Sequence, residues 1–122
     1  MCFRGIPMLW IQSGNIEKGR MKDFQTFVKK NDDLFQKFGP AGWAYRGTYA
    51  YVLGFGRYGV AQMWECKTYG DFDTLREHDD PNWNRLFEEY MDFFDPNAGE
   101  GVLLRAMGDT KVLEPPKAPK KR

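Results

Sequence analysis

The stretch from Val60 to Phe94 constrains the fold of this chain more than any other. Its first residues, 60–67, are rich in residues that favour a β-strand. A short helix is expected from about Asp71. Pro81 cannot continue that helix, but it suits the first turn of a new one, and apolar residues then recur at helical spacing as far as Phe94. A strand that leads into a helical region broken by proline favours an α+β domain.

The remaining segments complete the order of elements. A strand is expected over 8–13, and a helix over 17–38, where apolar residues recur at steps of three, four and seven. A second strand is expected over 43–55, with Gly47 as a bulge or bend, and a last strand over 102–107. The order β-α-β-β-α-β predicts a ferredoxin-like, four-stranded antiparallel sheet with its helices on one face.

Composition narrows the possible partners. The chain has 122 residues, with 18 basic and 17 acidic residues and a net charge of +1. We therefore expect no nucleic-acid or membrane partner, because the charge provides no electrostatic field that would attract either. No apolar run approaches the roughly 18 residues of a membrane span, and the first residues lack a signal-peptide pattern, so a cytoplasmic protein is expected. Residues 1–110 are expected to form one domain, and 111–122 a flexible Pro/Lys-rich tail.

The predicted strands are apolar on both faces. Val60, Trp64 and Cys66 alternate with Ala61 and Met63. An antiparallel sheet with one wet face alternates more cleanly between apolar and polar residues. The face that the helices leave open is therefore expected to pack on a second copy, sheet to sheet, in a homodimer.

Short motifs in the same region resemble a known group. They are Met63-Trp64-Glu65 at the end of a strand, Tyr69-Gly70-Asp71-Phe72 at the start of a helix, and Asp79-Asp80-Pro81 followed by Trp83. From Met8 to roughly Asp109 the chain resembles the dimeric α+β barrel superfamily. The small members of that superfamily include NIPSNAP-like proteins, antibiotic-biosynthesis-type monooxygenases and haem-degrading monooxygenases. The resemblance implies that two sheets form the barrel of a homodimer.

The resemblance also implies where a haem-degrading site would lie. Members of that class use an Asn on the first strand, and a Trp and a His in the second helical region. At these positions the chain has Gln12 or Asn15, then Leu75, then Leu86 or Phe87. Haem degradation is therefore disfavoured, and no cofactor is expected. His78 could still ligate haem, or it could be a helix-end histidine that faces solvent or caps backbone carbonyls.

A ligand site is expected between the sheet and its helices. Trp10, Trp43, Trp64 and Tyr49 could line it, and an arginine facing it could hold an anionic substrate or an enolate. Such a pocket would suit a small aromatic or apolar ligand, as in cofactor-independent monooxygenases. The ligand-binding candidates are Trp10, Gln12, Arg46, Tyr49, Gln62, Trp64, His78 and Arg105.

The alternative is a non-enzymatic structural or binding dimer with no open pocket. The aromatic residues would then fill the core, and Arg46 and Arg105 would pair with Glu65 or reach solvent. Whether the protein is an enzyme is left open by the sequence. No metal site is expected, because two adjacent acids before Pro81 are better explained as a helix cap. A cavity of a few hundred Å³ that contains Arg46, Gln62 or Arg105 would favour the first hypothesis. A cleft packed shut by Trp64, Phe27 and Phe87 would favour the second.

Overall fold

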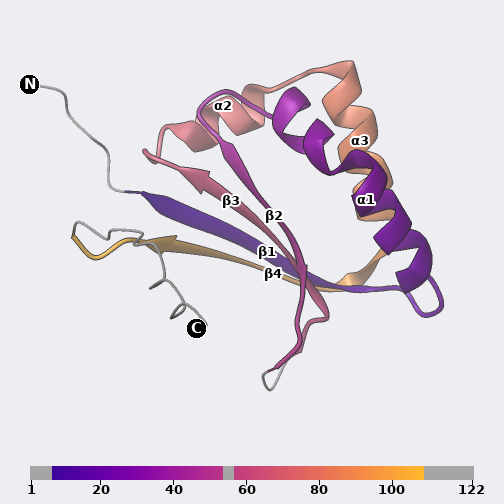
Figure 1. Ribbon diagram of the computed structural model, residues 1–122. Coiled ribbons are helices and arrows are strands. Elements are labelled where there is room, and N and C mark those ends of the chain that lie inside the picture. The colour runs from indigo at the N-terminus through magenta and orange to yellow at the C-terminus, as the bar shows by residue number, and fades with distance from the viewer. Residues whose placement is uncertain (1–6, 54–56, 109–122) are drawn as a thin grey trace, which may run out of the picture.

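The computed structural model describes residues 7–53 and 57–108 (Figure 1). Its elements are β1 (Met8–Ile16), α1 (Met21–Phe38), β2 (Ala44–Ala50), β3 (Val60–Cys66), α2 (Asp71–Glu77), α3 (Pro81–Asp92) and β4 (Phe94–Arg105). The four strands form one antiparallel sheet in the order β2-β3-β1-β4, and the helices cover one of its faces. This confirms the predicted ferredoxin-like α+β fold.

Several element boundaries differ from the prediction. The first strand runs on to Ile16, and α1 begins at Met21 instead of at residue 17. The strand expected over 43–55 is the shorter β2, which has the predicted bulge at Gly47. The strand expected from 102 instead begins at Phe94, which pairs with Ile16 across an irregularity in β1. Pro96 lies within this strand and is tolerated because β4 is an edge strand. The predicted tail, Cys2 and the tip of the 54–56 hairpin lie outside the described residues.

The break between α2 and α3 forms as the sequence predicts. One carboxylate oxygen of Asp80 accepts hydrogen bonds from the backbone N–H groups of Asn82 and Trp83, at 2.7 and 3.3 Å, and so caps α3. Among the described residues, no side chain caps the start of α2. The Asp71 carboxylate points back and accepts from two N–H groups of the preceding turn, at 2.9 and 3.0 Å.

Aromatic rings fill the layer between the sheet and the helices. Phe35 is fully buried and stacks on Tyr45 of β2, with 5.2 Å between ring centroids. Trp64 of β3 meets Trp83 of α3 edge to face at 5.6 Å. Aromatic pairs in these geometries add to the stabilisation that burial alone provides. This packing fixes α1 and α3 on the sheet.

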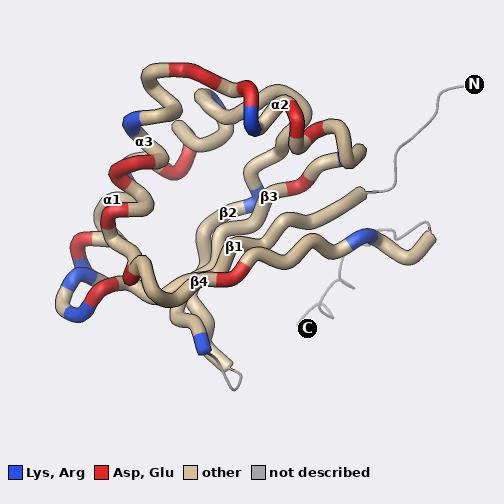
Figure 2. The backbone as a smooth tube through the Cα atoms, turned by 180° about the vertical axis from the view of Figure 1, so that it is seen from behind, with Lys and Arg blue, Asp and Glu red and all other residues tan. Residues whose placement is uncertain are grey.

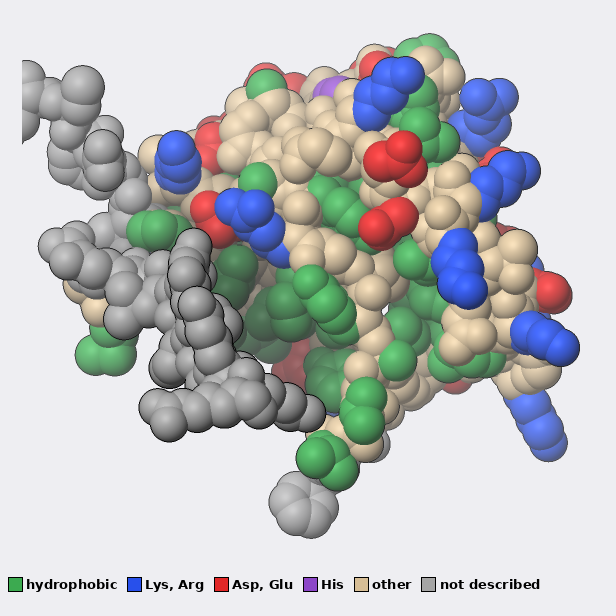
Figure 3. All heavy atoms as spheres, in the orientation of Figure 1, with side chains coloured by type: hydrophobic (Ala, Val, Ile, Leu, Met, Phe, Trp, Pro, Cys, Tyr) green, Lys and Arg blue, Asp and Glu red, His purple; other side chains and the backbone are tan. Residues whose placement is uncertain are grey.

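The opposite face of the sheet is apolar and uncovered by helices. Leu9 and Ile11 of β1 pair there with Leu104 and Val102 of β4, which are 49% and 39% exposed. Figure 2 shows that few charged residues interrupt the strands. In the space-filling view of Figure 3, hydrophobic side chains gather in the lower half of the molecule. The strands are thus apolar on both faces, as predicted, while the dimer stays a prediction.

Candidate functional site

All four tryptophans of the chain line one pocket between the sheet and the helices α2 and α3. The pocket has a volume of about 210 Å³. Its lining comprises Trp10, Gln12, Pro40, Trp43, Trp64, Leu75, Trp83 and Phe87. Trp10 and Trp64 are direct cross-strand partners on β1 and β3, so their indoles lie on the same face of the sheet. We call this site the tryptophan pocket.

Phe72 of α2 fixes two of the indoles from outside the pocket. It meets the ring of Trp43 at 4.9 Å and the ring of Trp10 at 5.6 Å, both edge to face. The indole N–H of Trp43 donates to the backbone carbonyl of Asp71 at 2.8 Å. These contacts hold two walls of the pocket in place before any ligand binds.

A chain of hydrogen bonds holds the third indole. The Trp64 indole N–H donates to Oε1 of the fully buried Gln62 at 2.9 Å, and Nε2 of Gln62 donates to the Thr48 hydroxyl at 3.2 Å. Thr48 lies 2.5 Å from the Tyr45 hydroxyl, which donates to the Asp32 carboxylate at 2.6 Å. Because Tyr45 donates to Asp32, Thr48 donates to Tyr45, and every bond in the chain points toward Asp32.

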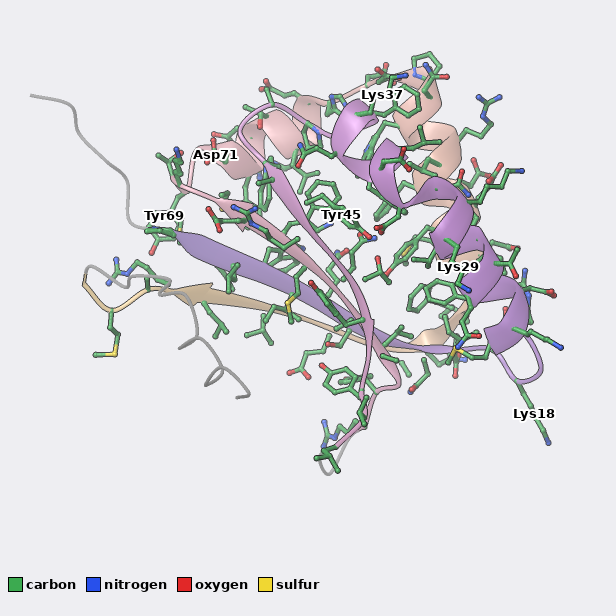
Figure 4. The ribbon with its side chains drawn as sticks, viewed as in Figure 1. Lys18, Lys29, Lys37, Tyr45, Tyr69 and Asp71 are labelled. Atoms are coloured by element: carbon green, nitrogen blue, oxygen red, sulfur yellow. The ribbon has the colours of Figure 1, made fainter. Side chains whose placement is uncertain are left out.

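The Tyr45 hydroxyl keeps its proton in this chain. Burial, followed by the hydrogen bond to Asp32, raises the pKa of Tyr45 above its ordinary value. Tyr45 lies between β2 and α1, as Figure 4 shows, whereas Asp32 lies on the exposed side of α1. The chain therefore connects a surface carboxylate with an indole of the pocket wall.

Gln12 provides the pocket with its free polar group. Its side chain is half-buried and forms no hydrogen bond with another residue that the structure describes. The other lining residues are tryptophan, proline, leucine and phenylalanine, so none of the lining side chains titrates. The pocket can thus offer a ligand aromatic surface and one amide, which both donates and accepts.

Five of the predicted ligand-binding residues do not line this pocket. Arg46 is 52% exposed at its side chain and pairs with Glu65 at 3.2 Å, which is the alternative that the sequence left open. Tyr49 turns its hydroxyl back to the Arg46 carbonyl at the β2 bulge. Arg105 is exposed at the end of β4. Gln62 accepts from the Trp64 indole N–H and does not line the cavity. An arginine that holds an anionic ligand is therefore not part of the tryptophan pocket.

His78 joins two helical segments instead of facing the pocket. Its Nε2–H donates to the backbone carbonyl of Phe38 at 2.7 Å, and its ring lies 5.8 Å from that of Trp83. This bond ties the end of α1 to the break between α2 and α3. It corresponds to the helix-end histidine that the sequence left open.

The positions where the resemblance places a haem-degrading triad meet in the tryptophan pocket. They hold Gln12, Leu75 and Phe87. These residues offer neither an imidazole nor an indole, so they do not reproduce the triad. Among residues 7–53 and 57–108, no three His, Cys, Asp or Glu side chains gather closely enough to hold a metal ion.

Trp83 and Phe87 line the pocket but were not among the predicted ligand-binding residues. They are one helical turn apart in α3 and stack at 5.5 Å. The proline break in the sequence could have indicated both residues. A new helix, α3, begins at Pro81, and its first turn places Trp83 against Trp64.

Comparison with known proteins identifies the fold. No family model matches the sequence, and no curated protein matches it. A NIPSNAP-like domain protein from Burkholderia xenovorans has a TM-score of 0.65 at 13% identity, over 94% of this chain and 97% of that one. A NIPSNAP family protein from Agrobacterium tumefaciens has a TM-score of 0.62 at 14% identity, over 90% and 94%.

This chain has the fold of the NIPSNAP proteins. A protein from Nitrosomonas europaea, named as a candidate antibiotic biosynthesis monooxygenase, shares the same fold. Its TM-score is 0.57 at 12% identity, over 91% of this chain and all of that one (100%). The NIPSNAP fold alone does not distinguish ligand binding from catalysis. None of the helices in the described part of the chain is long and apolar enough to cross a membrane.

Proposed function

We propose that the protein is a homodimer that binds a small, neutral, aromatic or apolar molecule in the tryptophan pocket. The observation that carries this proposal is the convergence of four indoles on one open cavity in which Gln12 is the free polar group. Ligand sites in proteins are typically apolar and aromatic, with a few polar groups that orient the ligand.

The size and chemistry of the pocket define the ligand class. At about 210 Å³ the pocket exceeds the roughly 150 Å³ apolar cavity that accepts benzene, so one or two fused rings fit. Since no lining side chain is charged, an ionised group would lose its hydration there without gaining a partner. A hydroxyl or carbonyl on the ring could instead bond to the Gln12 amide.

Cofactor-independent monooxygenation is a second candidate, supported by the name of the Nitrosomonas europaea protein. In such a step O₂ would convert a ring CH₂ into a carbonyl, with one oxygen atom entering the product and the other leaving as water. The substrate itself would supply the electrons. The reaction requires removal of a proton, yet no lining side chain of the tryptophan pocket titrates. Binding is therefore better supported than catalysis.

The uncovered face of the sheet supports the homodimer. Leu104, Val102 and Tyr49 expose 49%, 39% and 52% of their surfaces on that face. A twofold axis would place the same apolar surface of a second copy against them. The alternative of a non-enzymatic dimer with a filled core is less well supported, because the pocket is open.

The four indole N–H groups provide the test. Naphthol is titrated into nitrogen-labelled protein while the indole N–H resonances are followed by NMR. We expect all four signals to shift together with one dissociation constant, because all four tryptophans line the pocket. Signals that do not move at saturating naphthol would contradict the proposal.

Three variants test where the probe binds. Leu75→Trp should fill the pocket and abolish the shifts, whereas Leu53→Trp, at a position that is 91% exposed, should leave them unchanged. Because overpacking can disturb folding, Gln12→Leu is a milder test. It should weaken naphthol binding by about tenfold through the loss of one hydrogen bond.

A further inference from the structure

A second hollow adjoins the tryptophan pocket. It has a volume of about 700 Å³ and lies between the end of α3 and the stretch of β4 from Phe94 to Gly101. Trp10 and Gln12 line both cavities. We call this second hollow the β4 groove. Through the two shared residues the cavities border on each other.

Glycines keep the β4 groove open. Gly14 pairs with Gly99, and Gln12 with Gly101, on the face of the sheet that carries the helices. Because glycine has no side chain, the space over these positions on the helix-covered face of the sheet stays open. A Cβ atom at Gly101 would come within 2.4 Å of the Trp10 ring, so this indole lies directly over the β4 backbone. Trp10 therefore forms the partition between the two cavities.

Two polar groups that line the β4 groove lack protein partners among the described residues. Neither the Gln12 amide nor the Tyr90 hydroxyl forms a hydrogen bond with any residue in the described ranges, although Tyr90 is only 2% exposed. Burial raises the pKa of Tyr90, so the hydroxyl remains a neutral donor. No side-chain nitrogen or oxygen in the described ranges is both fully buried and without a partner, so the Tyr90 hydroxyl reaches the open space of the groove, where a ligand group can accept from it.

We propose that the ligand of the tryptophan pocket is elongated, with a fused-ring end among the indoles and a neutral, hydrogen-bonding chain in the β4 groove. The chain would pass Gln12 and Tyr90, whose free groups suit hydroxyl or amide oxygens. Asp95 lines the groove and disfavours a carboxylate or phosphate beside it. This inference rests on the proposed function and specifies its ligand class.

Size supports a ligand in two parts. Sites for drug-sized ligands usually measure about 300 to 1,000 Å³. The tryptophan pocket alone, at about 210 Å³, falls below that range, whereas the adjoining groove adds about 700 Å³. A ring system confined to the pocket would leave the unpartnered Tyr90 hydroxyl unused.

Three probes separate the two cavities. They are naphthol, naphthyloxyethanol with a neutral hydroxyl chain, and naphthyloxyacetate with a carboxylate chain. Dissociation constants come from the NMR titration, in which the backbone signals of Ala98 and Gly99 report on the β4 groove. We expect the neutral chain to tighten binding about tenfold over naphthol and to shift both groove signals. The carboxylate chain should bind more weakly than the neutral chain.

A groove-filling variant locates the chain. A Cβ atom at Gly99 would meet only the Ser13 carbonyl, at an ordinary 3.5 Å, so the backbone there has room for a Cβ, and we expect the ring of Gly99→Phe to occupy the groove. It should remove the gain from the neutral chain and leave naphthol binding unchanged. The matched control is Gly70→Phe, at an exposed glycine whose nearest neighbour is the Thr68 hydroxyl at 3.6 Å.

The outcomes distinguish this inference from the proposed function. If naphthol binds and the neutral chain adds nothing, the elongated ligand is ruled out while the binding function stands. If Gly99→Phe preserves the gain, the chain lies outside the β4 groove and the inference is wrong. If no probe binds, the proposed function fails and this inference fails with it.

Discussion

Gln62 shows how one buried polar residue shapes the tryptophan pocket. It is fully buried, and each end of its amide has a partner, so it adds no unsatisfied group to the core. Its carbonyl oxygen fixes the Trp64 indole, and its NH₂ group extends the hydrogen-bond chain toward Asp32. A polar residue at this position in a strand orients a pocket wall that apolar packing alone would leave free to rotate.

Replacing Gln62 should therefore loosen Trp64. In Gln62→Leu the Trp64 indole N–H loses its buried acceptor, so the free energy of unfolding should fall by about 2 kcal/mol. The measurement is urea denaturation, together with hydrogen exchange of the Trp64 indole N–H, which should become faster. Gln25→Leu, on the exposed side of α1, is the control and should leave both values unchanged. Unchanged exchange in Gln62→Leu would contradict the orienting role.

Buried hydroxyl and thiol groups predict a loss of stability at alkaline pH. Burial raises the pKa of Tyr45 and Tyr90, and it raises the pKa of Cys66 to about 11. Because these folded-state values lie above the unfolded ones, the folded state retains protons that the unfolded state releases. Stability should be constant up to about pH 8 and fall as the pH rises through about 9 to 11. Urea midpoints across this range check the trend, and Tyr45→Phe should reduce its slope.

Among the elements, α3 depends most clearly on local sequence. Asp80 caps its first turn and Pro81 begins it, so the helix starts where two adjacent residues dictate. This start sets the rotation of α3 and thereby places Trp83 and Phe87 in the tryptophan pocket. An element boundary therefore determines the composition of the site.

Loss of the cap should destabilise this element measurably. Asp80→Ala removes the acceptor of two backbone N–H groups, so the free energy of unfolding should fall by about 1 kcal/mol. Asp79→Ala is the matched control, since among the described residues its carboxylate accepts only from the side chain of Asn84, and its effect should be smaller. Thermal unfolding of the two variants measures the difference. Equal losses would indicate that the cap does not stabilise α3.

The sequence predicts local features of this fold better than distant ones. The proline break and the Gly47 bulge follow from the residues themselves, and the structure confirms both. The start of β4 at Phe94 could not be predicted, because it depends on pairing with Ile16, far away in the chain. The same holds for the site. Trp10 and Trp64 lie on strands and were expected there, whereas Trp83 reaches the pocket only through the docking of α3.

On the scale of the whole molecule, the sheet separates two surfaces with different properties. One face carries the helices and the tryptophan pocket, and the other is apolar and uncovered by helices. In the proposed homodimer the second face would be the interface. The chain would then use every face of its sheet, which accounts for strands that are apolar on both sides.

A single charge should prevent this association. Leu104→Glu places a carboxylate on the apolar face, where burial against a second copy would be unfavourable. Sedimentation at micromolar protein concentration should show a dimer for the unchanged chain and a monomer for Leu104→Glu. Met107→Glu, at a position that is 94% exposed beyond β4, is the control and should remain dimeric. A monomeric unchanged chain would contradict the proposed homodimer.

The alternation of β3 has a thermodynamic consequence. Gln62 and Trp64 lie on the helix-covered face of the sheet, where Trp64 lines the pocket, whereas the alternate residues Ala61 and Met63 lie on the opposite face. One strand seven residues long thus belongs to both the binding site and the proposed interface. If ligand binding shifts β3 even slightly, occupancy and self-association are linked, and each changes the equilibrium constant of the other by the same factor. The apparent affinity for a ligand would then vary with the concentration of the protein itself.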